Sequence, residues 1–272
     1  ELLPESFNPN NGFVISCNNS MVNENKYPYF LGCFFCVGYR AQRANDMLND
    51  MINKDIKMDI DYMKSMQKDT LDLSAKEMIQ DVLNHVNFDE KIDAACIEYD
   101  TNGEDIALKG LRNNKIDYNS KENKDKIKMA VDYLKAWDFK ADTDKIGPSI
   151  YAAFIYCVVR RIIVGGMYKA KKNMNKNSKI NIDTFTENLI CRVYNKAFSG
   201  VHAKLYKYYG FVIKILKENS KNNFWVNNYI DRDNIVLICL IDGMDLLKYH
   251  NTNTLKWGEF HKIETVHPLS AK

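Results

Sequence analysis

The chain has 272 residues, of which 46% are hydrophobic and 27% charged, which is enough for one large domain or two modest domains with a real core. The formal net charge is only +3, and the lysines do not interleave with aromatic residues, so no nucleic-acid partner is expected. The most apolar run, residues 149–159, is followed at once by two arginines and is too short for a membrane span.

The first predicted element is a short strand at residues 12–17, where apolar and polar residues alternate. The two faces of this strand are Phe13, Ile15 and Cys17 on one side and Val14, Ser16 and Asn18 on the other. The polar face ends at Asn18, and the following Asn19-Ser20 pair is typical of a turn. Residues 27–37 are rich in aromatic side chains and show no regular period.

From residue 40 onward the apolar residues recur every three or four positions, which predicts helices. The expected helical segments are residues 40–52, 73–86, 89–97, 125–137, 148–164, 183–198 and 202–217. Ser74 is the expected N-cap of the second segment, and Pro148 lies near the first turn of a helix that should be central and buried. Residues 169–179 are polar and predict a solvated loop.

Residues 235–247 are apolar enough for another core helix, although residues 235–241 alone also fit a buried strand. The pattern therefore divides the chain into a strand-bearing aromatic head (residues 1–39), a helical lobe (residues 40–250) and an irregular tail (residues 251–272). The expected fold class is mainly α.

The chain contains seven cysteines, an odd number, and their positions do not predict a disulfide framework. Four of them lie inside apolar runs, as small buried hydrophobic residues do: Cys96, Cys157, Cys191 and Cys239. Cys33 and Cys36 have CxxC spacing. A zinc site would require a second such pair or two well-placed histidines, which the sequence does not show.

A series of motifs in the same order resembles the penicillin acylase family. They are NP followed by GFVISCNN (residues 8–19), YRAQR (39–43), MQKDT with a following SA (66–75), LKAWD (134–138), and WGEFH with a following HP (257–268). These matches cover nearly the whole chain. They imply that the strand of the head belongs to an αββα core, the rest of which is absent from this chain.

Members of that family are N-terminal nucleophile hydrolases, in which self-cleavage leaves a serine as the first residue of the large subunit. The resemblance implies that the free α-amine, with a reference pKa of about 7.7–8.0, acts as the base for the serine hydroxyl. The implied reaction is cleavage of a linear amide, in an N-acyl compound or a β-lactam side chain, through an acyl-serine intermediate.

The resemblance implies that Asn18 is the side-chain donor to the developing oxyanion, since its amide is a neutral donor that does not titrate. From the residues alone, the pattern favours an ordinary turn residue at Asn18. The resemblance also implies that Arg40 holds this asparagine through its planar donor fork. Arg43 competes for that assignment because the register of the YRAQR motif can slip, and a surface or ion-paired arginine is the alternative for Arg40.

Other residues of these motifs are expected to be structural. His261 and His267 are not needed as bases if the α-amine has that role. Trp137 and Trp257 are expected to anchor the core, as large aromatic residues usually do. Asp69 is expected to be a polar packing residue of its helix.

Glu1 is not a nucleophile, so the chain is expected to be an internal fragment of the large subunit that is inactive alone. Its expected partners are the small subunit, the rest of the large subunit and a small N-acyl substrate. No cofactor is expected in the chain itself. Some family members bind calcium through an aspartate after the strand, but Leu31 occupies that place here. Export from the cell is common in the family, although no signal segment is visible.

The alternative function is a non-catalytic helical interaction module derived from the same family. Such a module should expose an apolar surface for a partner.

Overall fold

A computed structural model describes residues 3–23, 26–32, 35–89, 119–164, 208–218, 225, 232–247 and 255–261. Within these ranges the chain is mainly helical, as expected, and contains no strand beyond one isolated bridge. The expected helices at residues 89–97 and 183–198 and the loop at 169–179 lie outside the described residues, apart from Asp89. The same holds for Cys33, Cys96, Cys191 and His267.

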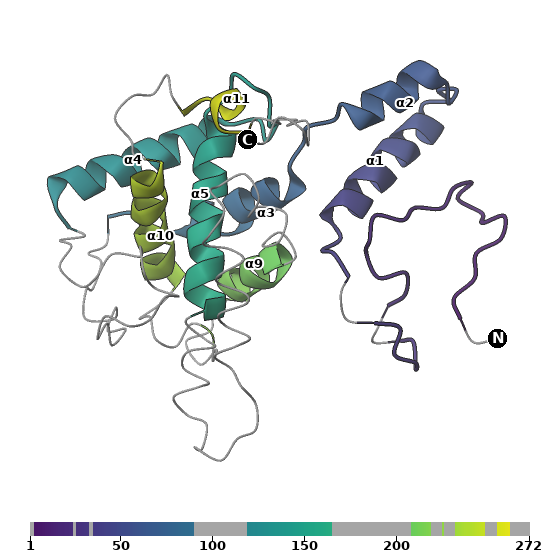
Figure 1. The fold of residues 1–272 in the computed structure, drawn as a ribbon, viewed down its shortest axis with the longest axis horizontal. Helices are drawn as coiled ribbons and strands as arrows, with labels where there is room; N and C mark the ends of the chain where they lie inside the picture. Colours follow the sequence, from purple (N-terminus) through teal and green to yellow (C-terminus); the bar gives the residue numbers. More distant parts are fainter. Residues whose placement is uncertain are drawn as a thin grey trace, which may run out of the picture.

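The body of the molecule is built around α5 (Gly147–Val159), which packs against α10 (Arg232–Leu246) and α4 (Lys121–Ala136) (Figure 1). Every residue of α5 except Tyr156 is buried, and Pro148 lies in its first turn, so the prediction of a central buried helix is confirmed. The helix continues as a π-helical turn, Arg160–Val164. Residues 235–241 lie within α10, so this segment is a helix and not the alternative buried strand.

Around this core lie α3 (Leu73–Asp81), a short 3-10 helix (Leu83–His85), α9 (Tyr209–Glu218) and the single turn α11 (Trp257–Phe260). The expectation that Ser74 caps α3 is wrong. Asp72 is the N-cap, because its Oδ1 accepts a hydrogen bond from the backbone N–H of Ala75 at 3.0 Å. Ser74 is buried one position inside the helix, where its hydroxyl donates to Asp72 at 2.6 Å.

Helices α1 (Tyr39–Asn53) and α2 (Ile60–Gln67) form an arm that stands beside the body (Figure 1). Neither helix has a fully buried residue. The two helices are joined by a hydrogen bond from the Tyr62 hydroxyl to the Met47 carbonyl at 2.6 Å. We call these two helices the α1–α2 arm.

The head runs beside α1 as irregular chain, and the predicted strand at residues 12–17 is not formed (Figure 1). The predicted alternation is nevertheless present, since Phe13, Ile15 and Cys17 are half-buried while the residues between them are exposed. A strand requires a hydrogen-bonded neighbour as well as an alternating pattern. Among the described residues, the segment has no such ladder.

Three charged residues among those described lie inside the helical core. Arg161 donates two hydrogen bonds to Asp242 on α10, one of them from Nε at 3.0 Å, and both side chains are nearly inaccessible. Arg160 is buried as well. Cys157 and Cys239 are also fully buried, and burial raises the pKa of both thiols well above the ordinary range, so they remain protonated and unreactive.

Trp137 anchors the body as expected, and it fixes the start of α5. Its indole Nε1 donates to the Lys140 carbonyl at 2.7 Å. The ring lies so close to Gly147 that a Cβ there would come within 2.5 Å of the Trp137 Cγ. Trp257 is only half-buried and stacks on His261 with ring centroids 4.6 Å apart. In the described part of the chain, no helix is long and apolar enough to cross a bilayer.

Candidate functional site

Asn18 and Arg40, far apart in the sequence, are in direct contact. Arg40 lies in the first turn of α1, and its Nη2 donates to the Asn18 Oδ1 and to the Cys17 carbonyl, each at 2.8 Å. The backbone of Asn18 has a φ of 61°, a left-handed conformation that asparagine tolerates better than most residues. The Asn18 carbonyl accepts a hydrogen bond from the backbone N–H of Cys36 at 2.6 Å. The turn is therefore held from two sides.

This contact sets the orientation of the Asn18 amide. Because its oxygen accepts from Arg40, its NH₂ group points away from the guanidinium, and the side chain is exposed. An amide nitrogen carries two donor hydrogens and no charge at any ordinary pH. The arrangement thus presents a neutral donor whose direction is set by a cation.

The neighbouring Asn19 has a different use. Its Oδ1 accepts from the backbone N–H of Cys17 at 3.1 Å, and its Nδ2 donates to the Ser20 carbonyl at 2.9 Å. The Ser20 hydroxyl in turn donates to the Val22 carbonyl at 3.0 Å. Asn19 and Ser20 therefore form the turn that the sequence predicts, and the side chain of Asn18 takes no part in it.

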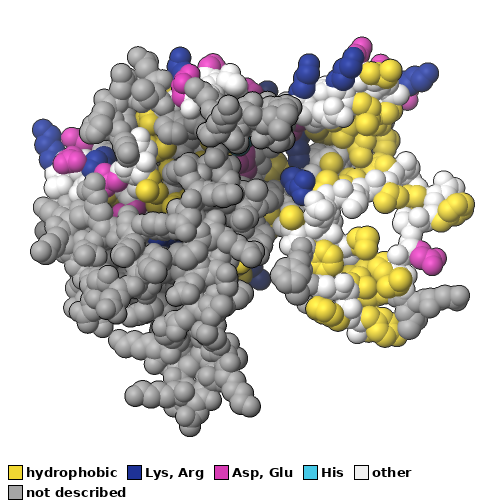
Figure 2. Space-filling model, viewed as in Figure 1, with side chains coloured by type: hydrophobic (Ala, Val, Ile, Leu, Met, Phe, Trp, Pro, Cys, Tyr) yellow, Lys and Arg dark blue, Asp and Glu magenta, His cyan; other side chains and the backbone are white. Residues whose placement is uncertain are grey.

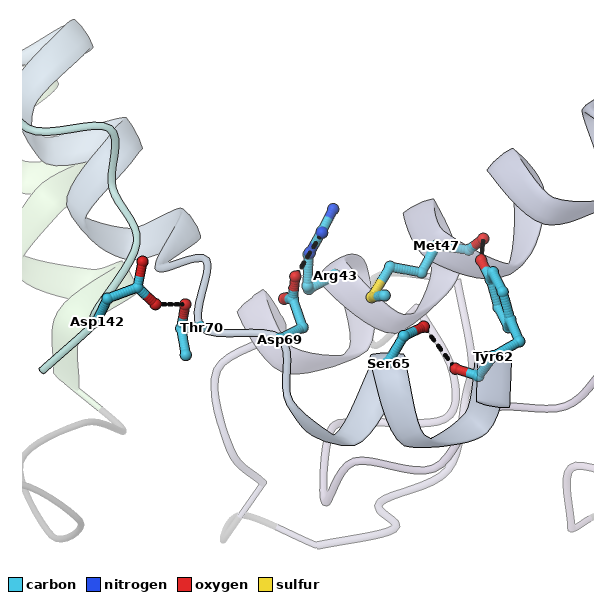
Figure 3. Close-up of polar contacts among 7 residues, drawn as sticks. All are labelled: Arg43, Met47, Tyr62, Ser65, Asp69, Thr70 and Asp142. Carbon is cyan, nitrogen blue, oxygen red and sulfur yellow. Dashed lines mark hydrogen bonds and ion pairs between the residues drawn. The ribbon is translucent and has the colours of Figure 1, made fainter. Parts of the chain in front are cut away.

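Arg43, the competing candidate, is occupied elsewhere. Its Nε and Nη2 donate to the two carboxylate oxygens of Asp69 at 2.8 and 2.6 Å (Figure 3). The hydrogen bonds from Arg43 hold the pKa of Asp69 below its ordinary value of 3.8. The structure thus places Arg40, not Arg43, against Asn18. Asp69 was expected to be a polar packing residue; in the structure it forms an ion pair with Arg43 of α1.

An open cavity of about 830 Å³ lies beside Arg40, between α1 and the chain that leads from α2 into α3. Its polar lining includes Arg40, Tyr39, His261 and the Arg43–Asp69 pair. The apolar lining is given by Ala44, Met47, Met66, Leu71, Leu73 and Ala141. Asn18 is not part of the lining but adjoins it through Arg40. His261 is exposed and stacks on Trp257.

Two features of this region have no counterpart in the sequence analysis. Tyr39 lines the cavity and donates through its hydroxyl to Glu77 on α3 at 2.7 Å. The Thr70 hydroxyl donates to Asp142 at 2.8 Å (Figure 3). Tyr39 and Thr70 both lie inside the quoted motifs, so their membership of these motifs could have marked them as candidate site residues. Their partners lie outside the motifs and could not be inferred from spacing.

Metal ligands do not gather in the described residues. No group of three or more His, Cys, Asp or Glu side chains there could hold a metal ion. The chemistry that the described arrangement offers is hydrogen bonding to a negative oxygen, through the amide of Asn18 and the guanidinium behind it.

Comparison with known proteins places this chain in a family. The model of the penicillin amidase family matches residues 1–272. No curated protein and no solved structure matches the chain. Since the family match extends over the whole chain, this protein belongs to the penicillin amidase family, whose members are amide-cleaving hydrolases.

Proposed function

We propose that this chain supplies the oxyanion donor of an amide-cleaving acylase, with the Asn18 Nδ2 as the donor and Arg40 as the residue that orients it. The observation that carries this proposal is the hydrogen bond from Arg40 to the amide oxygen of Asn18. Without it the amide could turn, and either its oxygen or its nitrogen could face the reacting group. With it, only the donor side points outward.

In this proposal the reaction proceeds by acyl transfer. A serine oxygen attacks the carbonyl carbon of the N-acyl substrate, and an α-amine takes the hydroxyl proton. The carbonyl oxygen then carries a negative charge, to which the Asn18 Nδ2 donates a hydrogen bond. When the intermediate collapses, the C–N bond breaks, the leaving amine takes up the proton and an acyl-serine remains. Water releases the acid in a second step.

The nucleophile in this proposal comes from another part of the protein. Ser20, close to Asn18, donates its hydroxyl to the Val22 carbonyl, which is a turn contact and not a contact with a base. We therefore propose that this chain alone does not hydrolyse amides. Residues 12–17, where Val14 is 67% exposed, form the proposed surface on which the remaining core would pair.

The proposed substrates are N-acyl compounds or β-lactams with an amide side chain. The cavity beside Arg40 has a volume in the range of small-molecule sites. It combines an apolar wall with polar groups near Arg40, as a substrate that contains both an acyl portion and a polar portion would require.

The test is Asn18→Ala in the complete protein, assayed with a panel of N-acyl nitroanilides. Removal of one oxyanion donor should lower kcat by about 10²–10³-fold, because this hydrogen bond strengthens only as charge develops. Asn84→Ala, at an exposed asparagine on the body, is the matched control and should leave kcat unchanged. A kcat for Asn18→Ala equal to that of the unmodified protein would refute the proposal.

One observation favours the alternative of a non-catalytic interaction module. The α1–α2 arm and the head carry exposed apolar side chains (Figure 2). Those of the two helices and of the loop that joins them are Ile52, Ile56, Met58, Ile60 and Met63. A patch of this kind is typical of a surface that another protein covers. The two functions differ in the nitroanilide assay, since the module predicts no turnover by the complete protein.

A further inference from the structure

The chain between α2 and α3 is fixed to the body of the molecule. Leu71 forms an isolated antiparallel bridge with Lys140, in which the Asp72 N–H donates to the Phe139 carbonyl at 2.8 Å and the Ala141 N–H donates to the Thr70 carbonyl at 2.9 Å. The Thr70 hydroxyl adds a hydrogen bond to Asp142 at 2.8 Å (Figure 3). Residues 70–72 are therefore attached to the body by hydrogen bonds, although they lead out to the arm.

Asp69 stands at the end of this fixed segment and binds α1. Both of its carboxylate oxygens accept from the guanidinium of Arg43, and the Asp69 side chain is only 17% exposed (Figure 3). A two-point contact between a planar guanidinium and a carboxylate is directional as well as strong. It restrains rotation of α1 about its own axis more than a single hydrogen bond would.

Arg43 and Arg40 lie three positions apart on α1, so their side chains leave the helix on the same face, one turn apart. Both line the cavity. Any rotation or shift of α1 that displaces Arg43 therefore displaces Arg40 as well. At the N-terminal end of α1, the Tyr39 hydroxyl binds Glu77, which also pairs with Lys217 on α9 at 2.8 Å. Arg40 thus lies between two attachments of α1 to the body.

We infer that Asp69 is a positioning residue for the oxyanion site, acting through Arg43 and α1 on Arg40 and so on Asn18. This inference rests on the proposed function of Asn18. Asp69 makes no contact with Asn18 in these interactions; its effect is to keep Arg40 where it can hold the Asn18 amide oxygen. A displacement of about 1 Å in such a group can lower the rate about 10²-fold.

The test is a double-mutant cycle between Asp69 and Asn18 in the complete protein, with N-acyl nitroanilides as substrates. Asp69→Asn keeps the shape of the side chain but removes its charge and one acceptor. We expect Asp69→Asn to lower kcat by about 10–100-fold, with a smaller change in KM, because the affected interaction strengthens in the transition state. In the Asn18→Ala background, Asp69→Asn should cause no further loss, because the group it positions is gone.

The outcomes separate this inference from the proposed function. If Asn18→Ala lowers kcat while Asp69→Asn leaves kcat unchanged, or lowers it equally with and without Asn18, the positioning role is wrong and the oxyanion role stands. If Asn18→Ala leaves kcat unchanged, the proposed function itself fails. If Asp69 had only a structural role, Asp69→Asn would reduce the yield of folded protein with and without Asn18, and the effects of the two substitutions on kcat would be additive.

Two further variants complete the experiment. Asp50→Asn removes an exposed carboxylate that pairs with Lys54 at the far end of the same helix, and it should leave kcat unchanged. If Asp69→Asn does not fold, Arg43→Lys replaces it in the cycle. It keeps the positive charge but loses the two-point geometry, and the same pattern of non-additive loss is expected.

Discussion

At the level of single residues, two arginines of the described chain pair with different kinds of acceptor. The amide oxygen of Asn18 accepts a hydrogen bond from Arg40, whereas deep in the core the Arg161 guanidinium donates to the carboxylate of Asp242. The first contact is exposed and leaves one side of the amide available. The second is enclosed by apolar helices, so its value lies in compensating a buried charge.

Asp242→Asn should be strongly destabilising. The change leaves the buried Arg161 guanidinium without this carboxylate, and loss of one partner of a buried ion pair costs about 3–5 kcal/mol. Urea unfolding of the chain measures the effect. The control is Asp50→Asn, whose partner Lys54 is 61% exposed and whose loss should cost less than about 1 kcal/mol. Equal costs for the two variants would contradict this account of the core.

Gly147→Ala tests the contact between Trp137 and the start of α5. A Cβ at this position would lie 2.5 Å from Cγ and 2.7 Å from Cβ of Trp137, neither of which can move without displacing the ring. The expected cost is about 1–3 kcal/mol of unfolding free energy. Gly38→Ala, where an added Cβ meets nothing within 4 Å and the backbone φ is −73°, should cost much less. A neutral Gly147→Ala would mean that the ring is not fixed as described.

At the scale of elements, the helices follow from periodicity, while their ends and attachments follow from contacts that periodicity does not contain. The alternation at residues 12–17 correctly separates half-buried from exposed side chains, but alternation cannot supply the neighbouring strand. Similarly, Ser74 and Asp72 are both good caps by residue type. Asp72 takes the role because its backbone is extended, with ψ of 99°, where the helix begins.

Asp72→Ala should destabilise the chain by about 1 kcal/mol, since the cap of α3 is lost. Asp72→Ser should retain most of the stability, because a serine hydroxyl can also accept from the Ala75 N–H. Thermal unfolding followed by circular dichroism checks both variants. If the two variants were equally destabilised, the role of Asp72 would not be that of a cap.

The attachment of α1 should depend on pH. The hydrogen bonds from Arg43 lower the pKa of Asp69 in the folded state, so the carboxylate is stabilised by folding. Its contribution to the unfolding free energy is therefore complete above about pH 4 and is lost as the pH falls through the folded-state pKa. The difference in stability between the unmodified chain and Asp69→Asn should shrink on acidification below about pH 4. If this stability difference instead grew as the pH fell, the ion pair would not contribute to stability as described.

At the scale of the whole molecule, the sequence predicts the helical lobe and the family better than the arrangement of the site. The motifs single out both Arg40 and Arg43 but cannot decide between them, because the two lie on one face of one helix. In the structure Asp69 pairs with Arg43 while Arg40 contacts Asn18, and this arrangement depends on the three-dimensional position of the chain between α2 and α3. The burial of Arg161 likewise depends on Asp242, which lies 81 positions further along the chain.

The most direct test of the central claim is N-terminal sequencing and intact mass of every polypeptide that the native gene produces. We expect a mature polypeptide that contains Asn18 and begins with serine, threonine or cysteine, whose α-amine can act as the base. If the polypeptide that contains Asn18 begins with any other residue, the chain does not belong to an N-terminal nucleophile site. It would then be a helical interaction module that retains the shape of its family.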